Sequence, residues 1–69
     1  MDEKWRALRE AVGGRRALAE LVGVTESTIH RWSREEVRPI RAVRVMVNKI
    51  CQEHGVPSVF EEEDHAPIE

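Results

Sequence analysis

The chain has few aromatic residues, a single cysteine and no long apolar run, and each shortage excludes a class of protein. Its 69 residues include two tryptophans, one phenylalanine and no tyrosine, so a core must be mainly aliphatic, which suits a small helical domain. Cys51 has no partner for an internal disulfide, which favours a cytoplasmic setting. The longest aliphatic run, residues 45–47, is far shorter than the roughly 20 residues that a membrane helix needs. We therefore expect one small cytoplasmic domain.

Patterns for catalysis and metal binding are also lacking. Cys51 and His54 form a Cys-x-x-His pair, while His30 and His65 lie elsewhere in the sequence. A zinc site needs about four ligands, and a cysteine on the apolar side of a helix is inert rather than activated. The paired acids, Glu35–Glu36 and those in residues 61–64, are adjacent in sequence, so they define no geometry for acid–base catalysis. We expect no enzyme activity, no cofactor and no metal site.

The charges are segregated along the chain. The formal net charge is −2, yet all eleven Lys and Arg residues lie between Lys4 and Lys49. Residues 61–69 contain five acids and no base, so residues 1–60 carry eleven bases against eight acids, a formal +3. A local basic stretch can bind phosphate even in an acidic chain. The sequence thus divides into a basic domain, residues 1–60, and an acidic, flexible tail, residues 61–69.

Apolar spacing predicts two short helices in the first third of the chain. The first helix, capped by Asp2, ends at the Gly13–Gly14 pair, and its apolar stripe has spacings of three and four residues. That stripe consists of Trp5, Leu8 and Val12. The second helix covers residues 15–22 and ends at Gly23, which tolerates a left-handed backbone. Its apolar face is expected to contain Ala17, Leu18, Leu21 and Val22.

Two further helices are predicted after Gly23. Thr25 can cap a helix over residues 26–33 by accepting a backbone N–H, with Ile29 and Trp32 as its buried positions. A three-residue turn forces this helix to cross its predecessor steeply. After a polar loop over residues 34–38, Pro39 suits the first position of a long helix that closes at Gly55. Its stripe consists of Ile40, Val43, Val47 and Ile50, and Ser58 is expected to cap one further short helix.

Residues 15–34, RRALAELVGVTESTIHRWSR, resemble the helix-turn-helix of Cro and phage-repressor proteins, the XRE-like family. The matching positions are Ala19, Gly23, Val24, Ile29 and Trp32. The preceding Gly13–Gly14, followed by Arg-Ala-Leu-Ala, resembles YdaS-like regulators, and the likeness covers most of residues 13–60. It implies an all-α, lambda-repressor-like bundle of four to five helices. Glu35 and Glu36 stand where this family often has a glycine.

The resemblance implies a sequence-specific regulator of transcription, most simply a Cro-like repressor that reads double-stranded DNA. In such proteins the second helix of the motif enters the major groove. The implied base contacts come from Glu26, Ser27, His30 and Arg31, and the implied phosphate contacts from Arg15, Thr25, Arg38 and Arg41. Arg31 can bind guanine bidentately and Glu26 can accept from cytosine, so we expect a G/C-containing half-site.

Two expectations concern partners. One such unit reads only a few base pairs, which favours a homodimer on half-sites about one helical turn, ~34 Å, apart. We expect the dimer contact at Gly55–Phe60 and the end of the long helix, because Val56 and Val59 look exposed, with Phe60 either in that contact or as a lid on the core. The alternative function is a protein-interaction module on the same fold, an antitoxin or a factor that docks on RNA polymerase. The acidic tail would then bind a basic partner.

Overall fold

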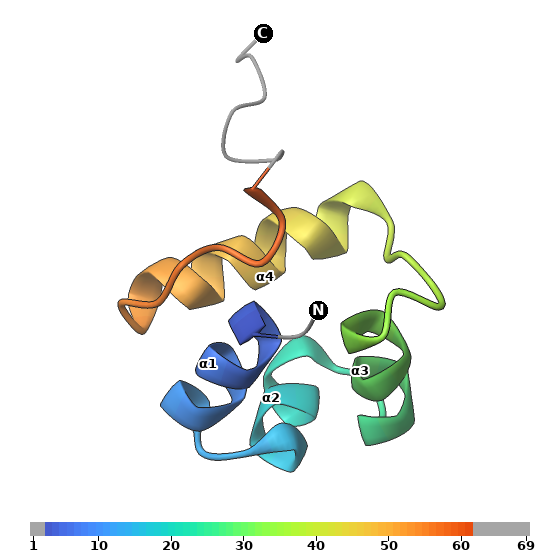
Figure 1. Cartoon of the computed structure of the whole chain (residues 1–69), viewed down its shortest axis with the longest axis horizontal. Coiled ribbons are helices and arrows are strands. Elements are labelled where there is room, and N and C mark those ends of the chain that lie inside the picture. The colour runs from blue at the N-terminus through green and yellow to red at the C-terminus, as the bar shows by residue number, and fades with distance from the viewer. Residues whose placement is uncertain (1–2, 62–69) are drawn as a thin grey trace, which may run out of the picture.

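The computed structural model describes residues 3–61, and these residues form four helices and no strand (Figure 1). The helices are α1 (Glu3–Val12), α2 (Arg15–Val22), α3 (Glu26–Ser33) and α4 (Arg41–Glu53). In Figure 1, α4 and the segment after it lie across one side of the molecule, and α1, α2 and α3 lie on the other. The predicted all-α class is confirmed. No helix in this part of the chain is long and apolar enough to cross a membrane.

The core fills the space between these two layers. It contains Trp5, Leu8, Leu18, Ala19, Ile29, Trp32, Val47, Cys51 and Phe60. The ring of Trp5 lies 6.2 Å from that of Trp32 and 5.7 Å from that of Phe60, which it meets edge-on. Such pairs add stability beyond the area that they bury. All three aromatic side chains are therefore core residues, and Phe60 closes the core as a lid.

A buried asparagine attaches the C-terminal segment to α4. The Asn48 amide donates to the carbonyl oxygen of Phe60 at 2.6 Å, and the Phe60 N–H donates to Asn48 Oδ1 at 2.9 Å. Val56 and Val59 are partly buried against the core, and Phe60 is 9% exposed. These apolar residues are therefore less exposed than the sequence suggests, because they pack against this chain's own core, and a dimer contact at this segment stays a prediction.

Two predicted helix faces also need correction. Leu21 is 52% exposed, because α2 turns Leu18 and Ala19 into the core, and at about 100° per residue Leu21 falls outside that arc. Ile40 is 70% exposed. It is the N-cap of α4, so the helix begins two residues after Pro39. Residues 58–60 are not helical, whereas Glu61 is helical. Residues 62–69, which would complete the expected fifth helix and the tail, fall outside the described residues, as does the Asp2 cap.

Candidate nucleic-acid interface

The turn between α2 and α3 is built as the sequence predicts. Gly23 has a left-handed backbone with φ of 89°, and its N–H donates to the carbonyl oxygen of Ala19 at 2.8 Å. The N–H of Val24 donates to the same oxygen at 3.0 Å. Thr25 then caps α3, because its hydroxyl accepts the backbone N–H of Thr28 at 3.2 Å. These bonds fix the position at which α3 starts relative to α2.

Two apolar side chains anchor α3 and leave its polar face in solvent. Ile29 is fully buried and Trp32 is 8% exposed, as predicted. The four side chains expected to contact bases all lie on the exposed face: Glu26, Ser27, His30 and Arg31. Since α3 is only eight residues long, two anchors three positions apart are enough to set which face it exposes.

Two adjoining hollows run along this exposed face, and together we call them the α3 groove. The first, of about 610 Å³, is lined by Arg15, Glu26, Ser27, His30, Arg31 and Glu36. The second, of about 620 Å³, shares Arg15, Glu26 and His30 with the first and extends to α1 through Arg9, Gly13, Gly14, Arg16, Ser33 and Arg34. Five arginines and two glutamates line the groove. It is therefore a basic surface formed by three helices.

One ion pair joins the first residues of α2 and α3 within the groove. Arg15 Nε lies 3.5 Å from Glu26 Oε1, and each side chain is about half exposed. At the other end of α3, Arg34 Nε lies 3.1 Å from Glu36 Oε2. Both glutamates that line the groove are thus paired with arginines of the same surface. These pairs reduce the repulsion that a bound phosphate backbone would meet.

The structure brings together five of the eight residues predicted to contact DNA. Thr25 is exposed and uses its hydroxyl to cap α3. Arg38 does not line the groove, because its guanidinium lies over the Phe60 ring, 5.9 Å from the centroid. Arg41 is exposed at the start of α4. These three residues lie outside the lining of the groove.

Sequence reasoning missed three arginines of the groove, Arg9, Arg16 and Arg34. Arg9 belongs to α1 and Arg34 follows α3, so nothing in their local sequence indicates that they share a surface. Arg16 also pairs with Glu20, one turn along α2. The double glycine supplies one signal, because it lines the groove itself and brings the end of α1 close to the start of α2.

Glu35 explains how α3 ends without the glycine that the family pattern expects. Its backbone is left-handed, with φ of 63°. The N–H of Glu35 donates to Trp32 O and that of Glu36 to Arg31 O, both at 3.0 Å. This pair of bonds is the Schellman motif, in which the left-handed position usually holds glycine. The helix therefore ends in the usual geometry with an unfavourable residue.

Within residues 3–61, the Cys-x-x-His pair of Cys51 and His54 is not part of a cluster of metal-ligating side chains. Cys51 is fully buried in the core, whereas His54 is exposed. Among residues 3–61 there is no group of three or more His, Cys, Asp or Glu side chains placed to hold a metal ion.

Comparisons with protein-family models, with curated proteins and with solved structures find no match to this chain. The chemistry of the α3 groove is therefore the basis on which a function can be inferred.

Proposed function

We propose that this protein binds double-stranded DNA sequence-specifically, as a Cro-like regulator of transcription, with α3 in the major groove. The observation that supports this most strongly is the lining of the α3 groove. Five side chains predicted to contact DNA, from two helices, meet on one exposed basic surface, while Ile29 and Trp32 hold α3 from beneath. The major groove is about 12 Å wide and admits one α-helix.

The groove residues divide by chemistry into base contacts and phosphate contacts. Arg31 carries a planar fork that suits guanine O6 and N7, and Ser27 and His30 offer shorter hydrogen-bonding groups beside it. Glu26 has two possible partners, a cytosine amino group and Arg15. The 3.5 Å ion pair favours Arg15 as the partner. In that arrangement Glu26 orients the Arg15 side chain, and the terminal nitrogens of Arg15 can bind a phosphate.

The arginines that flank α3 supply the remaining affinity. Arg9, Arg16 and Arg34 line the groove around the base-contacting set, where the phosphates on either side of the major groove would lie. Contacts of this kind position a protein on the duplex without reading its sequence. Arg41 adds a cation at the N-terminus of α4, where the helix dipole favours anions.

A selection from a random duplex pool tests the proposed function. We expect a palindromic G/C-containing consensus, and an affinity that falls steeply as salt is added, because phosphate contacts release counterions. A protein-interaction module would instead give weak binding with no enriched sequence. The control is the variant Ile29→Asp, which places a carboxylate in the core and unfolds α3. No sequence should be enriched from the same pool by this variant.

We also propose that the working unit is a homodimer, since one α3 reads too few base pairs for useful specificity. Gly55–Phe60, the contact that the sequence suggests, offers little exposed apolar surface, because Val56, Val59 and Phe60 pack on this chain's own core. The large apolar side chains that remain exposed within residues 3–61 are Leu21, Val37, Ile40 and Val45. A symmetric contact would bury such side chains.

A further inference from the structure

His30 lies at the junction of the two hollows that form the α3 groove. It lines both hollows, whereas Arg31 lines only the first and Arg34 only the second. The side chain is exposed, and the buried anchors of α3 set the face on which it lies. His30 therefore lies between the residues proposed to contact bases and the arginines proposed to contact phosphates.

Among the described residues that line the groove, His30 is the one whose side chain belongs to a class that changes charge near neutral pH. The imidazole of histidine does so between about pH 5 and 8, whereas carboxylates titrate near pH 4 and arginine stays charged. The other charged side chains of the lining are Arg9, Arg15, Arg16, Glu26, Arg31, Arg34 and Glu36. A pH-dependent change of charge in the groove therefore points to His30.

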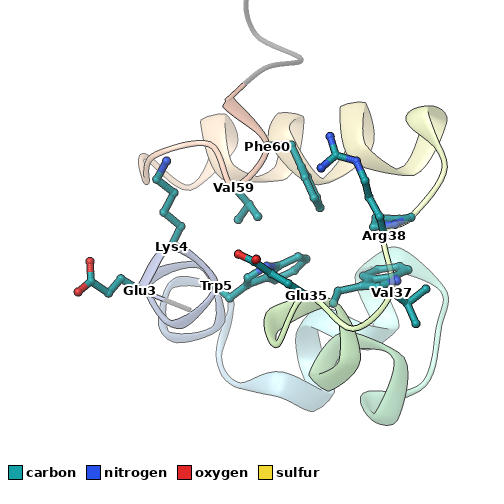
Figure 2. A pocket seen from close by; sticks show the side chains of 10 residues that line it. Glu3, Lys4, Trp5, Glu35, Val37, Arg38, Val59 and Phe60 are labelled. Carbon is teal, nitrogen blue, oxygen red and sulfur yellow. The ribbon is translucent and has the colours of Figure 1, made fainter. Parts of the chain in front are cut away.

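The charges that face His30 are mainly positive. On its own helix, Glu26 lies one turn before it and Arg34 one turn after it, and the Glu26 carboxylate pairs with Arg15. Figure 2 shows the Glu35 side chain extending toward Trp5 in a separate pocket. That pocket shares no lining residue with the α3 groove, and its charged residues are Glu3, Lys4, Glu35 and Arg38. The surroundings of His30 therefore stay basic until an anion enters the groove.

A bound duplex would bring hydrogen-bond acceptors to His30. Phosphate oxygens and the O6 and N7 atoms of guanine are acceptors, and the imidazolium form donates from both ring nitrogens, whereas the neutral ring donates from only one. Neighbouring phosphate charges also favour the charged form. We infer that His30 binds DNA as an imidazolium, so that complex formation takes up a proton and the affinity falls as the pH rises. This inference rests on the proposed function and adds a pH dependence to it.

The test measures affinity for the selected duplex at about pH 6 and about pH 8, at constant ionic strength. It uses the unaltered protein, His30→Gln and His54→Gln. His54 is the matched control, because it is exposed at the end of α4 and does not line the groove. We expect the unaltered protein and His54→Gln to bind about three- to tenfold more tightly at the lower pH. The affinity of His30→Gln should vary little with pH.

The same measurement with each guanine of the consensus replaced identifies the acceptor. Loss of the pH effect at one replaced guanine would assign the contact to that base, and its persistence at every position would assign the contact to a phosphate. Calorimetry in two buffers with different heats of ionisation gives a separate reading. The unaltered protein should take up protons on binding, and His30→Gln should take up fewer.

Two results would overturn the inference and leave the proposed function intact. One is an equal pH effect in His30→Gln and the unaltered protein. The other is selective binding by the unaltered protein with no pH effect and no proton uptake. Failure to select any duplex at either pH would instead refute the proposed function, and the inference with it.

Discussion

Single residues at helix ends show how much of this fold depends on backbone conformation. Gly55 ends α4 with φ of 71° and two bonds, from Gly55 N–H to Gln52 O at 3.2 Å and from Val56 N–H to Cys51 O at 3.0 Å. The end of α3 has the same pattern, with Glu35 in the place of the glycine. A left-handed backbone costs a residue with a side chain about 1 kcal/mol. Glu35 therefore makes the folded domain less stable than a glycine at the same position would.

We predict that Glu35→Gly is more stable than Glu35→Ala by about 1 kcal/mol, because both variants lose the carboxylate and only alanine keeps the unfavourable Cβ. For a domain of this size the difference corresponds to roughly 4 to 8 °C in Tm. Thermal unfolding followed by circular dichroism measures it. If the alanine variant were as stable as the glycine variant, the left-handed strain at the end of α3 would be disproved.

Asn48 gives a second prediction at this scale. Asn48→Ala leaves the N–H and the carbonyl of Phe60 buried without their partners, which costs about 1 to 3 kcal/mol for such groups. We expect a Tm lower by several degrees, measured by the same unfolding experiment. Gln52→Ala removes an exposed amide from the same helix and should change Tm little. Equal shifts in the two variants would show that the paired bonds do not hold the C-terminal segment.

At the scale of the element, the turn that sets α3 can be tested through its cap. Thr25→Ala removes the acceptor of the Thr28 N–H and should destabilise the domain by about 1 kcal/mol. Thr25→Ser retains the hydroxyl and should restore most of that loss. Urea unfolding of the three proteins measures the difference in free energy. Equal stability of the alanine and serine variants would mean that the hydroxyl contributes nothing to the start of α3.

The bounds of the helices follow from the sequence more closely than their faces do. Glycine at position 23 and threonine at position 25 act locally, so the ends of α2 and α3 are predictable without the fold. The orientation of a two-turn helix depends on its neighbours, so apolar spacing alone places Leu21 on the wrong face of α2. The capping position of Ile40 likewise depends on the extended backbone before α4.

Some residues of the candidate site are predictable from the sequence, and others are brought to it only by the packing of the helices. Residues of α3 and its partner Arg15 are predictable, because one helix and one short turn place them together. Arg9 and Arg34 join them only through the packing of α1 and α3 around the core. Arg38 shows the reverse case, since a cluster of arginines in the sequence does not reveal that its guanidinium lies over Phe60.

At the scale of the whole molecule, the proposed dimer predicts a mass of two chains. Sedimentation at high micromolar concentration should show this species, and Val45→Glu should shift the mass toward one chain, because a carboxylate would replace one of the exposed apolar side chains that a symmetric contact would bury. Ala11→Glu introduces the same group at an exposed position of α1 and serves as the control. A single-chain mass for the unaltered protein at every concentration would refute the dimer.

In the proposed function, Arg31 reads a base from the exposed face of α3. The most direct measurement is the affinity of the unaltered protein, Arg31→Ala and Lys49→Ala for the selected duplex and for the same duplex with each guanine of its consensus replaced. We predict that Arg31→Ala lowers affinity for the selected duplex by about 1 to 3 kcal/mol and removes the preference at one guanine, while Lys49→Ala preserves that preference. Equal losses of affinity in both variants, with the preference at every guanine intact, would contradict this role of Arg31.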